Sequence, residues 1–153
     1  MNNSHKTAMS RNSLSSAAKY LVEEDLLKGR VLDYGCGKGY DAKELRLYSF
    51  DPYYTSCTII DKEGRPTWMQ KYDTIMCNFV LNTLPKDEWE VVLDNIKKLL
   101  AKRGTAYIAV RNDRKNLNGI TKKGTFQIFV ELDLPVVKKT GNFIMYSLKN
   151  EDQ

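Results

Sequence analysis

The chain of 153 residues is long enough for one domain with one core, and its hydrophobic content of 42% separates it from disordered sequences. It holds a single histidine, His5, and three cysteines without a CxxC pair, which argues against a multi-histidine metal site and against a disulfide framework. Its apolar runs are too short to cross a bilayer, and residues 1–10 lack the apolar segment of a signal peptide. We therefore expect a cytoplasmic protein with no metal and no membrane partner.

The chain divides into a short polar arm, residues 1–12, and one domain, residues 13–150. The domain opens with a segment whose apolar residues recur at helical spacing, which predicts a helix over 13–27. Ser13 or Ser15 can cap its first turn, because a serine hydroxyl accepts a hydrogen bond from a backbone N–H that the helix leaves unpaired. A helix is thus expected ahead of the first strand.

Two short β-type segments follow, over 30–34 and 47–51, and the first of them leads into a glycine-rich loop. Between them only residues 41–45 have helical character, so the crossover helix is expected to be very short. Residues 53–71 are ambiguous, although 57–60 could form a further strand.

Strand and helix alternate more regularly in the second half of the chain. Apolar runs predict strands over 72–79 and 105–110, and the helix between them is expected to begin at Pro85 and to end at Gly104. Residues 111–124 form a basic segment that is expected to be a loop.

The last segments, 136–137 and 143–148, are separated by a turn sequence and predict a terminal hairpin. Strands that alternate with helices form a mostly parallel sheet with right-handed crossovers. The expected fold class is therefore α/β, with a mostly parallel sheet and a C-terminal antiparallel hairpin.

The loop after the first strand has the sequence Asp33-Tyr34-Gly35-Cys36-Gly37-Lys38-Gly39. Ligands of open α/β sheets bind beyond the carboxyl ends of the strands, and glycines let the backbone turn tightly and approach a ligand. A Walker A loop does not fit, because Gly37-Lys38 is followed by glycine and not by Ser or Thr. A dinucleotide fingerprint fits poorly, because its third glycine comes one residue early and Tyr40 holds the expected place. The pattern D-x-G-x-G-x-G, by contrast, matches at every fixed position.

This loop, together with Asp51 at the end of the second strand, resembles the class I methyltransferases that use S-adenosylmethionine (SAM). More narrowly, the chain resembles the methyltransferases that are associated with DNA phosphorothioation systems. The stretches that carry the resemblance are 6–11, 31–39, 50–53, 78–82 and 119–127.

The resemblance implies a compact Rossmann-like methyltransferase fold with SAM as cofactor, in which Asp51 holds the ribose hydroxyls. It implies cofactor contacts from Arg11, Asp33, Gly35, Cys36, Gly37, Gly39, Asp51, Pro52, Asn78 and Phe79. The chain departs from the family after Asp51, where no clear third strand ends in an acidic residue, so the contact to adenine stays open.

Asn78 and Arg111 are the candidate catalytic residues. Asn78 ends the strand at which donor and acceptor meet in this fold, but Asn78-Phe79-Val80-Leu81 lacks the prolines of the amino-methylating DNA enzymes. Cys77 has no neighbouring proline and is expected in the core rather than as a nucleophile. Arg111 follows the next strand and could either orient an acceptor or pair with Asp113.

The charge of the chain is uneven. Residues 97–139 hold eleven Lys and Arg against three acidic residues, a net charge of +8, whereas the whole chain has +5. This favours an anionic acceptor, nucleic acid and DNA first, with an ordinary solvated surface as the alternative. A chain of this size would read a long sequence only as a homo-oligomer or with a partner subunit. The expected function is SAM-dependent methylation of nucleic acid; the alternatives are a non-catalytic SAM-binding module, a SAM-cleaving enzyme, or methylation of a small molecule or protein.

Overall fold

The computed structural model describes residues 13–35, 37, 40–51 and 70–151. Several sequence predictions concern residues outside this part: the arm, a strand at 57–60, and the cofactor contacts of Arg11, Cys36, Gly39 and Pro52.

A six-stranded sheet lies at the centre of the described part, in the order β2-β1-β3-β4-β8-β7. Its strands are β1 (Val31–Tyr34), β2 (Tyr48–Phe50), β3 (Tyr72–Asn78), β4 (Leu100–Arg111), β7 (Val136–Lys139) and β8 (Phe143–Lys149). The four strands from β2 to β4 are parallel, whereas β8 is antiparallel to both β4 and β7. The predicted α/β fold with a C-terminal antiparallel hairpin is confirmed.

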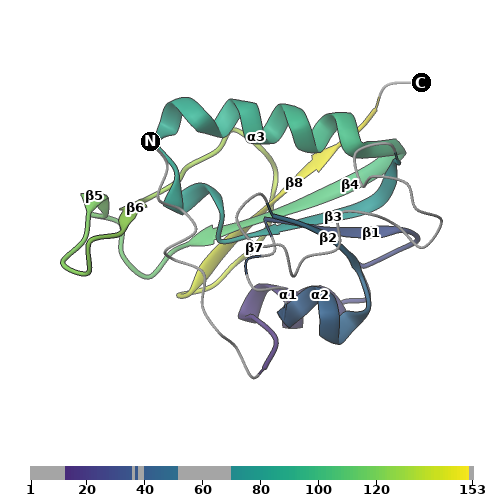
Figure 1. Ribbon diagram of the computed structural model, residues 1–153, viewed down its shortest axis with the longest axis horizontal. Helices are drawn as coiled ribbons and strands as arrows, with labels where there is room; N and C mark the ends of the chain where they lie inside the picture. The colour runs from purple at the N-terminus through teal and green to yellow at the C-terminus, as the bar shows by residue number, and fades with distance from the viewer. Residues whose placement is uncertain (1–12, 36, 38–39, 52–69, 152–153) are drawn as a thin grey trace.

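Helices cover both faces of this sheet (Figure 1). The long helix α3 (Lys86–Leu99) lies on one face, and α1 (Ser16–Glu23) and α2 (Tyr40–Leu45) lie on the other. Because β1, β3 and β4 are parallel, their carboxyl ends meet at one edge of the sheet, which we call the carboxyl edge. The glycine-rich loop follows β1 at this edge.

The first helix is shorter than its sequence predicts. Ser15 caps it by accepting a hydrogen bond from the Ala18 amide at 3.2 Å, as the sequence suggested. The helix ends at Glu23 instead of residue 27, because Asp25 takes a positive φ of 54° and the Leu26 amide turns back to the Leu21 carbonyl at 2.9 Å.

The boundary between α3 and β4 also differs from the prediction. The helix ends at Leu99 and the strand begins at once, five residues before the expected start at 105. The strand is irregular there: Arg103 has a φ of 64°, and the register against β3 shifts between Tyr72 and Thr74. Gly104 lies so close to β3 that a Cβ on it would stand 2.9 Å from the Tyr72 carbonyl oxygen. β4 therefore begins earlier than its apolar pattern predicts, because the close backbone contact with β3 leaves no apolar pattern in the sequence.

The segment expected as a basic loop holds a strand of a second, two-stranded sheet. β5 (Asn118–Ile120) pairs antiparallel with β6 (Phe126–Ile128), and the pair lies beyond the carboxyl end of β4 (Figure 1). The sequence analysis missed this hairpin, because strands of three residues are too short for an alternating pattern to be recognised.

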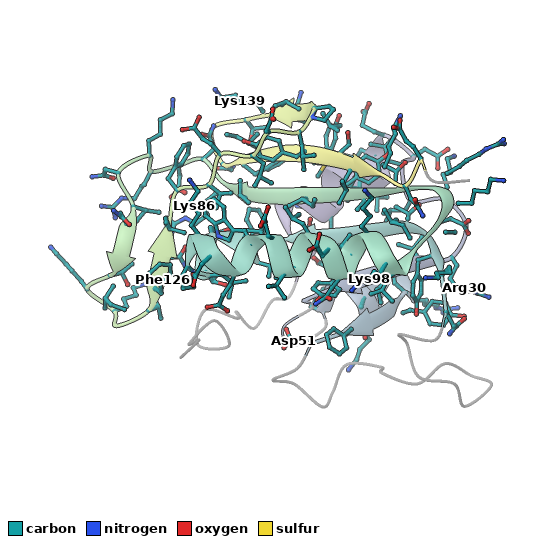
Figure 2. All side chains as sticks on the ribbon, turned by 90° about the horizontal axis from the view of Figure 1, so that it is seen from above. Arg30, Asp51, Lys86, Lys98, Phe126 and Lys139 are labelled. Atoms are coloured by element: carbon teal, nitrogen blue, oxygen red, sulfur yellow. The ribbon has the colours of Figure 1, made fainter. Side chains whose placement is uncertain are left out.

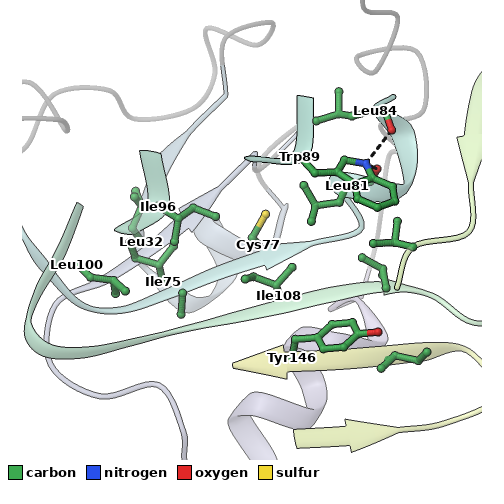
Figure 3. Packing of buried hydrophobic residues seen from close by; sticks show 14 of the residues in the cluster. Leu32, Ile75, Cys77, Leu81, Leu84, Trp89, Ile96, Leu100, Ile108 and Tyr146 are labelled. Atoms are coloured by element: carbon green, nitrogen blue, oxygen red, sulfur yellow. Dashed lines mark hydrogen bonds between the residues drawn. The ribbon is translucent and has the colours of Figure 1, made fainter. Parts of the chain in front are cut away.

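The larger core lies between α3 and the sheet (Figure 3). Ile75 and Cys77 of β3 point into it, while Met76 between them points to the smaller cluster under α1, as alternation along a strand requires. Trp89 of α3 is 6% exposed, and its indole N–H donates to the carbonyls of Leu81 and Leu84 at 3.0 and 2.9 Å. Trp89 and Cys77 both belong to this core, and for Cys77 this confirms the expectation from the sequence.

Candidate cofactor and acceptor site

The glycine-rich loop is hydrogen-bonded to the end of β2. Gly35 and Gly37 have φ values of 75° and 60°, a region that residues with a Cβ rarely adopt. The Gly35 amide donates to the Phe50 carbonyl at 2.7 Å, and the Gly37 amide donates to Oδ2 of Asp51 at 2.8 Å. The structure therefore brings Asp51 to the loop, as the sequence analysis expected of a shared ligand site.

The loop also lies close to the segment that follows β3. A Cβ on Gly35 would stand 2.6 Å from Cγ2 of Val80, well inside van der Waals contact. Val80 comes two residues after Asn78, so the glycine-rich loop and the candidate acceptor position share one edge of the sheet. Only a residue without a side chain fits between them.

Asp33 is buried beside two other carboxylates. Its residue is 4% exposed, and burial, followed by the charges of Asp41 and Asp51, raises its pKa well above the usual value for aspartate. A cluster of carboxylates in a poorly hydrated place favours a ligand with positive charge. The methionine ammonium and the sulfonium of SAM are such charges, so the residues present fit this cofactor.

Asp41 joins the loop region to α1, a contact that the sequence analysis missed. Its carboxylate accepts hydrogen bonds from the amide and the hydroxyl of Ser15 at 3.0 and 2.7 Å. Ser15 in turn caps α1. An aspartate in the first turn of a helix is visible in the sequence, but a partner 26 residues away is not.

The side-chain carboxamide of Asn78 is buried at the carboxyl end of β3. Both heteroatoms of its carboxamide are shielded from solvent, and neither has a hydrogen-bond partner among the residues that the structure describes. A buried polar group left unpaired costs about 1–3 kcal/mol. A carboxamide in this state can still donate to and accept from a ligand.

Phe79, the next residue, has a strained backbone. Its φ is 62°, and its amide donates to the Ala109 carbonyl of β4 at 2.8 Å. Such a conformation costs a residue with a side chain roughly 1–3 kcal/mol and is concentrated at functional sites. The strain lies directly beside the unpaired Asn78 carboxamide.

Cys77 and Arg111 are engaged elsewhere. Burial raises the pKa of the Cys77 thiol, which excludes a thiolate nucleophile. The Arg111 guanidinium donates to both oxygens of Asp113 at 2.8 and 2.7 Å. This hydrogen bond lowers the pKa of Asp113 and raises that of Arg111. The ion pair was one of the two alternatives that the sequence left open.

Two carboxamides pair with each other, one near Asn78 in the sequence and one in β6. Asn82 lies in the short helix η3 (Leu81–Thr83), is 2% exposed, and donates from Nδ2 to Oε1 of Gln127 in β6 at 3.0 Å. Both residues lie in stretches that carry the family resemblance, 78–82 and 119–127, but no signal in the sequence marks them as partners.

Within the described ranges, no group of three or more His, Cys, Asp or Glu side chains is arranged to hold a metal ion. No helix in the same ranges is long and apolar enough to span a membrane.

A family model described as a methyltransferase domain matches residues 7–127. This match spans most of the chain, so the chain belongs to that family. With the sheet order and the glycine-rich loop, the match makes this a class I methyltransferase domain with SAM as cofactor. No curated protein matches the chain significantly by sequence.

Solved methyltransferase structures share the fold. TehB from Haemophilus influenzae superposes with a TM-score of 0.62 at 14% identity, covering 91% of this chain and 63% of that one. The N-methyltransferase NodS from Bradyrhizobium japonicum, in complex with S-adenosyl-L-homocysteine, gives 0.56 at 15%, covering 89% and 86%. The 1,6-didemethyltoxoflavin-N1-methyltransferase of Burkholderia thailandensis gives 0.55 at 17%, covering 89% and 77%.

The chain is shorter than some of these structures. It spans 63% of the length of TehB and 63% of a protein solved in a study of echinomycin biosynthesis. The chain is 14–20% identical to these structures, which shows a shared fold but not a shared acceptor.

Proposed function

We propose that the protein transfers the methyl group of SAM to a nucleic acid, and that DNA is the preferred acceptor. The observation that carries the proposal is the unpaired Asn78 carboxamide at the carboxyl end of β3, on the edge that also holds the glycine-rich loop. A carboxamide has both a donor and an acceptor, which suits the amino and ring-nitrogen edge of a nucleobase.

The protein's own groups mainly bind and orient. Asp33, Gly35, Gly37 and Asp51 hold the cofactor, which when bound supplies an electrophilic methyl group. Asn78 holds the acceptor in line with that methyl group. Orientation of this kind can lower a barrier by up to about 7–11 kcal/mol, so the reaction needs no histidine base from the chain.

The placement of basic residues supports an anionic acceptor. Of the eleven basic residues in 97–139, four lie at or near the start of β4, on the opposite edge of the sheet, and Arg111 is paired with Asp113. The remaining six are exposed and belong to the carboxyl edge: Arg114, Lys115, Lys122, Lys123, Lys138 and Lys139. Phosphates at this edge would meet a local excess of positive charge.

The narrower resemblance to methyltransferases of DNA phosphorothioation systems favours DNA over RNA. Because a domain of this size contacts few base pairs, we propose that it acts as a homo-oligomer or with a partner subunit on its target.

The test is a transfer assay with SAM labelled in its methyl group, run on a host lysate that is then fractionated by nuclease and protease treatment. We expect label in the DNA fraction, and loss of that label with Asn78→Ala. Val91→Ala, a change at an exposed position on α3, is the control. Label in the protein fraction would contradict a nucleic-acid acceptor. Cleavage of SAM without labelling of any acceptor would indicate a SAM-cleaving enzyme. If SAM is neither transferred nor cleaved, the protein is a SAM-binding module.

A small-molecule acceptor is the second candidate. It is favoured by the structural similarity to the methyltransferase solved with bound 1,6-didemethyltoxoflavin. Label that stays in the low-molecular-mass fraction after both nuclease and protease treatment would support it.

A further inference from the structure

The β5–β6 hairpin is an arm outside the main sheet. We define it as residues 117–129, because the Phe129 amide closes its base on the Leu117 carbonyl at 3.0 Å. At its tip the Thr121 amide donates to the Thr125 carbonyl at 2.8 Å, and the two threonine hydroxyls lie 3.0 Å apart. Backbone and side-chain bonds therefore hold the turn that carries the tip residues.

The hairpin and the residues just before it carry positive charge and no negative charge. Lys122 and Lys123 lie in the hairpin, Arg114 and Lys115 precede it, and residues 114–130 include no Asp or Glu. All four basic side chains are exposed, and Lys122 and Lys123 lie in the turn. A merely solvated surface commonly mixes the two signs, whereas a surface for a polyanion does not. The apolar Ile120 next to the turn is 67% exposed, which suits contact with sugars or bases between phosphates.

The hairpin is anchored to the acceptor side of the site. β6 packs on η3, and the buried bond between Asn82 and Gln127 joins the two elements. η3 begins three residues after Asn78, so this bond sets where the hairpin stands relative to the unpaired carboxamide. Asn82 Oδ1 is also buried, with no hydrogen-bond partner among the residues that the structure describes.

We propose that the β5–β6 hairpin is the nucleic-acid-binding arm of the enzyme. Lys122 and Lys123 bind phosphates of the acceptor, and the Asn82–Gln127 pair fixes the arm at the angle that brings the target group over Asn78. This inference rests on the proposed function for the class of acceptor, but it adds the element that binds the acceptor and the pair that positions it.

The first experiment compares two double variants that remove the same charge. Lys122→Ala with Lys123→Ala changes the tip of the arm, whereas Lys97→Ala with Lys98→Ala changes the far end of α3. Figure 2 shows Lys98 and the hairpin residue Phe126 near opposite ends of α3. The readout is the affinity for a fluorescent DNA duplex between about 50 and 200 mM salt.

Each phosphate contact contributes about 0.9 to the slope of log K against log salt. The tip variant should therefore lower this slope by about 2, and the α3 variant should leave it unchanged. An equal fall of the slope in both variants, or an unchanged slope in the tip variant, would contradict the proposal that the hairpin binds nucleic acid. Wild-type protein that methylates no nucleic acid would overturn the proposed function instead, so the two failures are distinguishable.

The second experiment tests positioning. Asn82→Ala should lower kcat for methyl transfer at least tenfold while the affinities for SAM and DNA stay near those of the wild type. The exchanged pair Asn82→Gln with Gln127→Asn keeps both carboxamides and should recover part of kcat. An unchanged kcat in Asn82→Ala, or a fall in DNA affinity as large as that in kcat, would overturn the positioning role.

Discussion

The core under α3 and the carboxyl edge of the sheet differ in how their buried polar groups are paired. In the core, the indole N–H of Trp89 has two carbonyl partners, and the side chains around it are buried. At the carboxyl edge, the Asn78 carboxamide is buried without a partner in the part of the chain that the structure describes, Phe79 is strained, and Asp33 lies beside two other carboxylates. Each of these features costs folding free energy that a bound ligand can offset. The core thus has the polar pairing that stability requires, whereas the carboxyl edge has the unpaired and strained groups from which we propose a binding site.

The largest effect on stability is expected in the core. Trp89→Ala removes a buried indole together with its hydrogen bonds to the Leu81 and Leu84 carbonyls, so the free energy of unfolding should fall by about 3–5 kcal/mol. Urea denaturation measures the loss. Val91→Ala on the same helix, at a position that is 59% exposed, should change it by less than about 0.5 kcal/mol. Similar losses in the two variants would contradict the assignment of the core.

A smaller effect on stability with a large effect on binding is expected at the loop. Gly35→Ala forces a side chain into a φ of 75° and against Val80, which should cost roughly 1–3 kcal/mol and weaken SAM binding more than tenfold. Calorimetry with SAM measures the affinity.

Gly124→Ala is the matched control for the loop variant. Its φ is 80°, but a Cβ there meets nothing within 4 Å, and it lies in the hairpin turn away from the loop. We expect similar backbone strain with unchanged SAM affinity. If Gly35→Ala binds SAM as well as Gly124→Ala does, the loop is not the cofactor site.

Asp33→Asn should separate stability from binding. A buried carboxyl whose pKa is raised in the folded state disfavours folding as pH rises above the ordinary aspartate pKa, because the unfolded chain releases that proton more readily. The variant should therefore melt at a higher temperature than the wild type at neutral pH, and this advantage should vanish in acid. It should also bind SAM more weakly, since it lacks the charge that attracts the ligand.

Thermal unfolding across acid to neutral pH, with and without SAM, tests the Asp33 prediction. Asp94→Asn on the exposed face of α3 serves as the control for loss of one negative charge. A lower melting temperature for Asp33→Asn at neutral pH would show that the buried carboxylate stabilises the ligand-free fold.

The smallest effect is expected at the Arg111–Asp113 pair. Arg111→Ala should cost less than about 1 kcal/mol, because the pair is partly exposed and screened by solvent. Since Arg111 lowers the pKa of Asp113, the contribution is present above the ordinary aspartate pKa and is lost as pH falls. Urea denaturation at neutral and acid pH measures it. We expect Arg111→Ala to leave the rate of methyl transfer unchanged. If this rate falls in Arg111→Ala but not in Asp113→Asn, Arg111 is an acceptor-binding residue.

The sequence by itself determined the class of fold and the place of the loop. Alternating apolar segments and turn residues predicted the order of the main elements, because burial of apolar side chains is a local property that leaves a period in the sequence. The spacing from Asp33 to Gly39, with Asp51 after the second strand, predicted the loop and its neighbour, and the Gly37–Asp51 hydrogen bond now joins them. The predicted boundaries of α1 and β4 were wrong, because backbone contacts determine where these elements begin and end and the side-chain pattern does not.

Only the tertiary structure decided which polar groups meet and which stay unpaired. Ser15 with Asp41 and Asn82 with Gln127 are 26 and 45 residues apart, and no local pattern marks such pairs. The division of the basic residues between two edges of the sheet also depends on strand direction, which places Lys98, at the end of α3, far from the β5–β6 hairpin residue Phe126 (Figure 2). Hydrogen bonds and surface charge act between neighbours in space, so the folded chain, and not the order of its residues, determines where they act.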